Sequence, residues 1–443
     1  MRSGDDAIPQ STEKRSLFMT TGLLFVLLMA ISLVILVVVA KLPVSLSLAA
    51  TSILILLVAG DGGLHIDKLV EGMFGYLDVG LVLITAMIFM KILEASGLLT
   101  ELTRAIIIAF GRSPLGLLVA LTVVIMFPGM ITGSCTASVL GTGAIVAPIL
   151  VEMGLPLLVA GAFISSAAVY GMIAPPVNVL VMTIGGGIDL PYIGFDIPLA
   201  LFSFPLAILT SIYLGYRHVQ KDKLALVIER SRASGGEGGF LLYLPLIVVF
   251  VLMIGPKAFP HWFPDPRLPL TFLIGSILAL FTGKRVKPIK AAQEGVNEIL
   301  PVIGILFGVG MLIEVMTLTG IRGAVVIGAL SLPDYLMLAG VAIILPLFGG
   351  VSVYGGASVL GVPFALAMLG QNQIIVLSAL SLIGAMGSYM PPVALTPVVT
   401  AKMIGEPEYG KIARLCIVPS IFAIGVGLLM IIFANPIAKF LGV

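Results

Sequence analysis

Long apolar runs alternate with short polar segments along almost the whole chain. Each run is roughly 17 to 25 residues long, which is the length a helix needs to cross a hydrocarbon core of about 30 Å. The runs begin at Leu17, Pro43, Val79, Leu115, Leu157, Pro198, Phe240, Leu268, Pro301, Leu338, Ile374 and Ile412. This pattern predicts an all-α polytopic membrane protein.

Composition supports the same interpretation. Of 443 residues, 59% are hydrophobic and only 10% are charged, with a mean hydropathy of +1.19. So few polar side chains cannot coat a water-soluble globule of this size. A net charge of +2 gives no reason to expect nucleic acid as a partner. Cys135 and Cys416 lie in apolar stretches without ligand spacing, so we expect neither a disulfide framework nor a metal cluster.

The first sixteen residues form a polar tail of mixed charge, 1–16. The apolar run that follows is too long for the core of a signal peptide and has no clear small-residue cleavage site. We therefore expect this segment to be retained as the first helix.

The two halves of the chain repeat one another. ASVLG at 137–141 recurs at 357–361, an offset of 220 residues (357 − 137), and Pro175-Pro176-Val177 recurs as Pro391-Pro392-Val393. Further upstream, matched Pro, Gly and Glu-Gly positions keep an offset of 223 (266 − 43). Such a collinear series predicts two copies of one membrane unit, 17–216 and 240–443, joined by a loop at 217–239.

Basic residues predict which side of the membrane each loop faces, because they are enriched in cytoplasmic loops. The joining loop carries five of them, and a second basic cluster follows the next hairpin: Arg217, Lys221, Lys223, Arg230 and Arg232, then Lys284, Arg285, Lys287 and Lys290. The segment between these groups, with Lys257, His261, Trp262, Asp265 and Arg267, would face outward.

The counterpart of the second basic cluster in the first copy is net acidic: Asp61, His65, Asp67, Lys68 and Glu71. Equivalent loops on opposite sides indicate inverted repeats with an odd number of crossings each. We expect about five transmembrane helices per copy, plus one re-entrant hairpin and one broken helix. Residues 98–112 fit an amphipathic surface helix before the first hairpin.

Four segments rich in Gly, Ser and Pro predict irregular backbone inside the membrane. Two are hairpin tips, at 129–138 and 349–358, within re-entrant hairpins at about 115–153 and 338–369. Two are Pro-Pro breaks at Pro175 and Pro391, within broken helices at about 157–186 and 374–403. Irregular chain at membrane depth occurs only where it is buried in protein or lines a wet cavity.

These segments are therefore the candidate binding site. Broken helices offer freed carbonyls and half-helix ends to a cation, and N-terminal ends to an anion. Hydroxyls of Thr132, Ser134, Thr136, Ser138, Ser352, Tyr354 and Ser358 could complete the coordination of a cation and donate to a carboxylate, with Asn178 and Thr396 in reach. Small residues and prolines also serve close helix packing and kinks, so packing is the competing interpretation for each residue alone.

The ionisable residues inside the spans are few. Lys91 and Glu94 match the region of Glu314 in the second copy, where an interface or snorkelling role is favoured. No aspartate or histidine lies mid-span in a hairpin, which favours sodium held by neutral oxygens over a proton relay without deciding between them.

At the tips and Pro-Pro loops the chain resembles the large membrane subunit of TRAP transporters. The motif Gly-x-x-x-Gly-Ser-x-x-Ala at 129–137, Pro-Pro at Pro175 and Pro-Pro-Val at Pro391 stand in that family's order, and the resemblance runs from about residue 40 to the end. It implies sodium-coupled import of organic acids such as C4-dicarboxylates across a bacterial inner membrane, by an elevator mechanism. It also implies a small membrane subunit and a periplasmic binding protein as partners.

The resemblance implies two sodium sites, one at each tip with its Pro-Pro loop. Their residues would be Thr132, Gly133, Ser134, Gly171 and Pro175, and Ser352, Gly355, Gly356, Gly387 and Pro391. The substrate anion would contact Ser134, Thr136, Ser138, Asn178, Ser358 and Thr396. Cys135, Tyr354 and the sequence PPVALT at 391–396 depart from the usual motifs.

Other functions stay open to different degrees. A stand-alone symporter of the divalent-anion or gluconate type shares the same plan, and a channel can also use broken helices. A membrane enzyme or pump is disfavoured, because the sequence has no paired mid-membrane carboxylates, no Ser-Lys pair and no phosphate loop. We expect no catalytic residues and no cofactor, with sodium as the coupling ion.

Overall fold

The computed structural model describes residues 24–59 apart from 26 and 30, then 66–233, 239–259, 263, 265–330 and 333–443. The predicted tail at 1–16, the start of the first run at Leu17, and Asp61, His65, His261 and Trp262 lie outside these residues. Within them every regular element is a helix.

The first half contains η1 (Ile35–Val39), α2 (Val44–Ala59), α3 (Ile66–Phe74), α4 (Leu77–Ala95), α5 (Leu98–Phe110), α6 (Pro114–Thr132), α7 (Cys135–Ser138), η2 (Val139–Gly143), α8 (Ala144–Glu152), α9 (Leu157–Ile173), α10 (Val179–Gly186), α11 (Asp196–Gly215), η3 (Tyr216–His218) and α12 (Lys221–Ala233). The second contains η4 (Phe240–Tyr243), α13 (Leu244–Ala258), α14 (Arg267–Ala279), α15 (Pro288–Leu318), α16 (Ile321–Leu330), α17 (Asp334–Gly349), α18 (Val353–Val359), α19 (Gly361–Ala367), α20 (Gln373–Ala385), η5 (Met386–Tyr389), α21 (Leu395–Ile404), α22 (Tyr409–Ile432) and α23 (Ala434–Leu441).

Among the described residues, five helical segments are long and apolar enough to cross a membrane. They are α6, the continuous helix Cys135–Glu152, Asp196–His218, α15 and α22, and the pair α3 and α4, bent by 47°, makes a sixth if it is counted as one span. The predicted all-α, multi-pass membrane fold class is thus confirmed. The other apolar helices are shorter, because glycines and prolines interrupt them.

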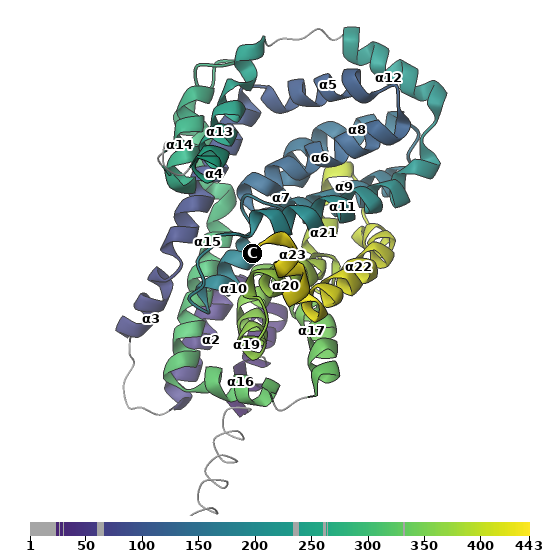
Figure 1. Cartoon of the computed structure of the whole chain (residues 1–443). Coiled ribbons are helices and arrows are strands. Elements are labelled where there is room, and N and C mark those ends of the chain that lie inside the picture. Colours follow the sequence, from purple (N-terminus) through teal and green to yellow (C-terminus); the bar gives the residue numbers. More distant parts are fainter. Residues whose placement is uncertain are drawn as a thin grey trace, which may run out of the picture.

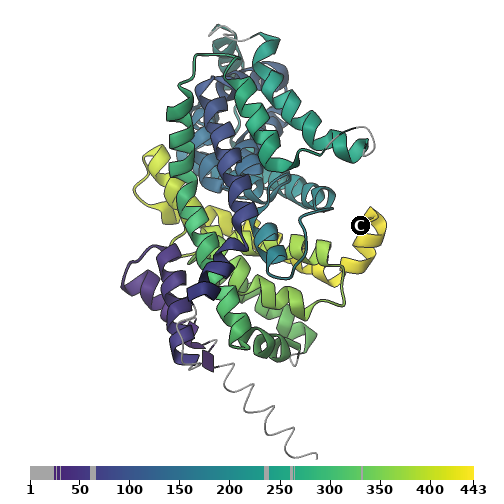
Figure 2. The ribbon, with the colours of Figure 1, turned by 90° about the vertical axis from the view of Figure 1, so that its left-hand side faces the viewer.

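The helices group into two bodies. In one, α15 packs along α2, α3 and α4, while α14 packs on α4 and α13 on α14. In the other, α6 to α11 pack with α17 to α23 around α9 and α20. Figures 1 and 2 show α15 running the height of the molecule beside the second body. The short helices α5 and α16 join the bodies, since each leads from a helix of the first into a hairpin of the second.

Two backbone contacts in the first body are related by the sequence offset. A Cβ built on Gly72 would lie 2.5 Å from the Gly310 carbonyl oxygen, so α3 and α15 cross with their backbones touching. A Cβ built on Gly295 would lie 3.1 Å from the Met87 carbonyl oxygen, where α15 crosses α4. Residues 72 and 295, and 87 and 310, are both 223 apart (295 − 72, 310 − 87). Reciprocal contacts of this kind are expected of two copies related by a two-fold axis.

Two segments differ from the sequence pattern in detail. The joining segment at 217–239 contains the helix α12, because Leu224 and Val227 give it an apolar stripe that is buried beside α5. The helix α15 starts at Pro288, well before the apolar run at Pro301, because small and apolar residues of this mixed stretch face α4.

The charged residue expected to snorkel has two partners. Lys91 Nζ lies 3.0 Å from Glu94 and 2.8 Å from Glu298, and its side chain is only 19% exposed. The Glu298 contact connects α4 to α15, so Lys91 joins two helices of the first body rather than pairing with Glu314.

Candidate functional site

The first hairpin enters along α6 and returns along α7, η2 and α8. Gly133 makes the turn with a φ of +63°, a conformation that favours glycine, and the Ser134 hydroxyl caps α7 by accepting from the Ala137 N–H at 3.3 Å. The two arms are joined where the Gly129 N–H donates to the Ser138 Oγ at 2.7 Å and the Thr142 Oγ1 donates to the Ile125 carbonyl at 3.4 Å. Ser138 is fully buried and already bonded within the hairpin.

The second hairpin has the same plan with different bonds. Helix α17 ends at Gly349, and the Ser352 hydroxyl caps α18 by accepting from the Gly355 N–H at 3.0 Å. Ser358 Oγ donates to the carbonyls of Tyr354 and Gly355, at 3.2 and 2.9 Å. In each copy a serine therefore begins the returning arm and satisfies one of its free N–H groups.

The first broken helix is stabilised at its gap by one amide. Between α9 and α10, Asn178 donates to the Ile173 carbonyl at 2.9 Å and accepts from the Val181 N–H at 3.0 Å. It also donates to Ser381 of α20 at 3.1 Å, which connects the two copies. These bonds satisfy backbone groups that Pro175 and Pro176 leave free, and they use both amide hydrogens of Asn178.

Each tip touches the break of its own copy through equivalent atoms. The Val177 N–H donates to the Met130 carbonyl at 3.1 Å, and the Val393 N–H donates to the Gly350 carbonyl at 3.1 Å. Beside these bonds, a Cβ built on Gly171 would lie 2.5 Å from the Met126 carbonyl oxygen, and one on Gly387 would lie 2.6 Å from that of Pro346. Only glycine permits this approach, so each tip and break form one unit.

Contacts between the copies bring the two units together. The Tyr354 hydroxyl donates to the Gly133 carbonyl at 2.8 Å, which joins the two tips directly. The Thr396 hydroxyl donates to the Cys135 sulfur at 3.3 Å, which joins the second break to the first tip. The structure therefore gathers all four irregular segments predicted from the sequence.

The predicted site residues differ in what remains available to a ligand. Thr132 is buried and donates to the Pro128 carbonyl at 2.7 Å, whereas Thr136 is half-buried. Pro175 is half-buried, but Pro391 is exposed, so the second break reaches the surface. No group of three or more His, Cys, Asp or Glu side chains placed to hold a metal occurs within the described ranges. The oxygens that converge here come from backbone and hydroxyl groups.

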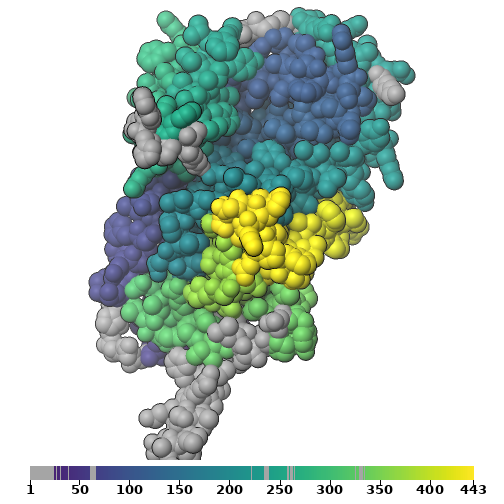
Figure 3. All heavy atoms as spheres, viewed as in Figure 1, coloured from purple at the N-terminus to yellow at the C-terminus, as the bar shows by residue number. Residues whose placement is uncertain are grey.

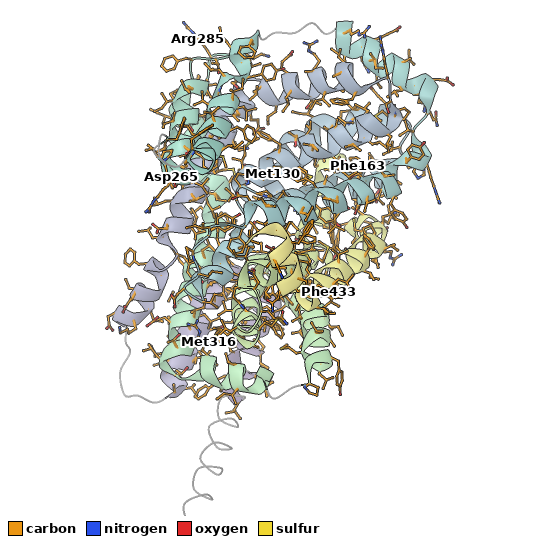
Figure 4. All side chains as sticks on the ribbon, in the orientation of Figure 1. Met130, Phe163, Asp265, Arg285, Met316 and Phe433 are labelled. Carbon is orange, nitrogen blue, oxygen red and sulfur yellow. The ribbon has the colours of Figure 1, made fainter. Side chains whose placement is uncertain are left out.

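The site lies deep in the molecule. In Figure 4, Met130 beside the first tip lies between Arg285, at one end of the molecule, and Met316, towards the other. Figure 3 shows the C-terminal residues covering the middle of this face. A small apolar recess separates the first tip and break from α13; its lining is Phe127, Met130, Ile131, Pro176, Leu246, Val249, Phe250 and Met253.

Two contacts that the sequence did not reveal hold α10 to the first body and to α16. The Tyr76 hydroxyl, from the bend between α3 and α4, donates to the Thr183 carbonyl at 2.9 Å. Arg322 of α16 donates to the Gly187 carbonyl. Each pair is more than a hundred residues apart in sequence, and backbone carbonyls carry no sequence signal, so only the fold could identify them.

Comparison with known families decides what the chain is. Residues 30–437 match the family described as "Tripartite ATP-independent periplasmic transporter, DctM component". The chain belongs to this family. The match confirms the resemblance to the TRAP large membrane subunit, and it identifies a component of a secondary transporter rather than a member of an enzyme family. The description also places DctM proteins in tripartite systems, which work with further components.

Among solved structures, the chain is similar to the YdaH transporter of Alcanivorax borkumensis, whose crystal structure is described as revealing an unusual topology. The TM-score is 0.58 at 16% identity, over 83% of this chain and 87% of that one. At this identity the likeness shows the shared fold. No curated protein sequence matches the chain.

Proposed function

We propose that this protein is the large permease component of a TRAP-type system that imports a small organic anion, such as a C4-dicarboxylate, together with sodium across a bacterial inner membrane. The observation that carries the proposal is the meeting of two hairpin tips and two helix breaks at one buried place. Tyr354 to Gly133 and Thr396 to Cys135 are the contacts that join them.

Sodium is favoured by the kind of oxygen present. The tips and breaks offer carbonyls and hydroxyls but no carboxylate, and half-helix C-terminal ends add partial negative charge. One sodium would bind Thr132, Gly133, Ser134, Gly171 and Pro175; the other would bind Ser352, Gly355, Gly356, Gly387 and Pro391. In each set, the residues come from a tip and a break that already touch.

The organic anion would bind where helix N-termini and hydroxyls face one another. Thr136 and Ser134 at the start of the helix Cys135–Glu152 are suited to donate to a carboxylate. Thr396 at the start of α21 already donates to the Cys135 sulfur, so it would hold the second break against the first tip. Ser358 is buried and already donates to the carbonyls of Tyr354 and Gly355, so it would hold the second tip in place. Ser138 and Asn178 already bond within the protein, so their contribution would be to hold the tip and the break in place.

Alternating access would come from movement of one body past the other. The body with α6 to α11 and α17 to α23 carries the whole candidate site, and the body around α15 would be the scaffold. The helices α5 and α16 would act as the links. The bond from Tyr76 to Thr183 connects the two bodies, so such a movement would break it.

Uptake by proteoliposomes tests the proposal. The protein is reconstituted with the small membrane subunit and the periplasmic binding protein of a TRAP system, and accumulation of labelled C4-dicarboxylates is measured with an inward sodium gradient or an equal potassium gradient. We expect accumulation only with sodium and only with the binding protein.

Three results would contradict part of the proposed function. Equal accumulation without the binding protein would favour the stand-alone symporter. Flux that does not saturate and shows no counterflow, the exchange of labelled for unlabelled substrate, would indicate a channel. Accumulation driven equally by both cations would contradict sodium coupling.

A further inference from the structure

Tyr354 occupies an unusual position between the two hairpins. It lies in the first turn of α18 at the second tip, yet its hydroxyl reaches the first tip and donates to the Gly133 carbonyl at 2.8 Å. The hydroxyl also lies 3.7 Å from the sulfur of Met172, near the end of α9. The side chain is 4% exposed, so one phenol contacts both tips and the first broken helix inside the protein.

The carbonyl that Tyr354 binds is held in a fixed direction. Gly133 ends α6 with a φ of +63°, and its N–H donates to the Gly129 carbonyl at 2.7 Å. A Cβ on Gly133 would lie 2.3 Å from the Val179 Cγ2, so the turn has no room for a side chain. Because a carbonyl oxygen has two lone pairs, the phenol uses one and leaves the other for a cation.

The other end of Tyr354 is tied to the second tip. Its carbonyl accepts from the Ser358 hydroxyl at 3.2 Å, and it lies between Ser352, which caps α18, and Gly355, whose N–H that cap binds. A shift of the Gly133 carbonyl would therefore be transmitted through the phenol to the first turn of α18.

We infer that Tyr354 couples the two candidate cation sites, so that binding at the first tip positions the oxygens of the second. This inference rests on the proposed sodium sites. Tyr354 is a positioning residue here: it acts through the Gly133 carbonyl and does not itself bind the cation. Coupling between sites is reciprocal, so it must be visible in the binding of sodium alone, without any organic substrate.

Equilibrium binding of ²²Na⁺ to the purified full chain tests the coupling, with potassium replacing sodium to hold ionic strength constant. Tyr354→Phe keeps the ring and removes only the donor. We expect the wild type to bind with a Hill coefficient above 1. In Tyr354→Phe we expect the coefficient to fall to about 1 and half-saturation to rise by about 5-fold or more.

Tyr170→Phe is the matched control, because Tyr170 is also fully buried but its hydroxyl accepts from Thr210 of α11 at 3.3 Å. It should bind sodium as the wild type does. Gel filtration and thermal unfolding establish that each variant is folded. Should Tyr354→Phe aggregate, Tyr354→Met also lacks the donor and carries the same expectation.

The outcomes separate this inference from the proposed function. Saturable sodium binding that is identical in wild type, Tyr354→Phe and Tyr170→Phe overturns the coupling and leaves the sodium sites standing. A wild-type Hill coefficient of 1 would also overturn the coupling and leave the sodium sites standing. No saturable sodium binding by the wild type overturns the sodium proposal, and the coupling with it.

Discussion

At the scale of single residues, the site depends on hydroxyls that begin the returning arms of the hairpins. Ser134 and Ser352 each accept a bond from a backbone N–H three residues later, so each has a structural role that is separable from ligand binding. Glycine is nearly as good as serine at such a cap, differing by only a few tenths of a kcal/mol. That property allows the two roles to be tested apart.

Ser134→Gly should leave the protein folded but weaken sodium-dependent uptake. Loss of one oxygen ligand, worth about 1 kcal/mol, predicts that half-saturating sodium rises by about 5- to 10-fold, with the free energy of unfolding changed by less than about 0.5 kcal/mol. Sodium titration of uptake and thermal unfolding in detergent measure the two effects.

Ser113→Gly is the control for Ser134→Gly. Ser113 caps α6 in the same way, accepting from the Gly116 N–H at 3.1 Å, but lies at an exposed helix end. The Ser113→Gly substitution should change neither the half-saturating sodium concentration nor the free energy of unfolding. Equal sodium dependence in both variants would remove Ser134 from the cation site.

How far the site could be predicted differs between residues. The tips were predicted because Gly, Ser and Thr cluster in otherwise apolar runs, and the structure places Thr132 to Ser138 beside Gly171 and Thr396. The partners of these residues could not be predicted, since Asn178 to Ser381 and Tyr354 to Gly133 depend on the packing of one copy against the other. Hydroxyl composition alone also does not reveal that the Ser138 oxygen accepts from the Gly129 N–H across the hairpin.

At the scale of elements, the tip and the break of each copy are held together by backbone contact at a glycine. Gly171 meets the Met126 carbonyl and Gly387 meets the Pro346 carbonyl, both main-chain oxygens that cannot turn aside as a flexible side chain can. The elements were predictable here because Pro-Pro pairs break helices. The full length of α15 and the presence of α12 could not be predicted, because their polar residues lower the mean hydropathy of these helical segments.

Gly171→Ala should destabilise the protein by about 2 to 3 kcal/mol, because the new methyl group overpacks a contact between two helix backbones. Thermal unfolding monitored by gel filtration measures the loss. Gly425→Ala is the control: Gly425 lies within α22, and a Cβ there has no neighbour within 4 Å.

The control should be as stable as the wild type or slightly more so, since alanine favours a helix over glycine. A Gly171→Ala protein as stable as Gly425→Ala would show that α6 and α9 do not touch as described.

At the scale of the whole molecule, the proposed mechanism requires two copies with opposite orientation. The reciprocal contacts of Gly72 with Gly310 and of Gly295 with Met87 are what a two-fold relation between copies would produce. Figure 1 shows the basic segment before α15 and the start of α17 at opposite ends of the molecule. The charge pattern predicts that the first of these is cytoplasmic.

Single cysteines at Lys287 and Tyr335 test this sidedness. Both positions are exposed, and the native Cys135 and Cys416 are buried. An impermeant maleimide added to intact cells should label Tyr335→Cys, at the end that the charge pattern predicts to be periplasmic, and should label Lys287→Cys only after the membrane is opened. Labelling of Lys287→Cys in intact cells would reverse the orientation.

The most direct test of the whole account is a pair of electron cryo-microscopy maps of the protein, one in sodium and one in potassium at equal ionic strength. We predict density present only in sodium, in contact with oxygens of Thr132 to Ser134 and the Gly171 break, and with those of Ser352 to Gly356 and the Gly387 break. Maps that are identical at both tips, or sodium density found only elsewhere, would contradict it.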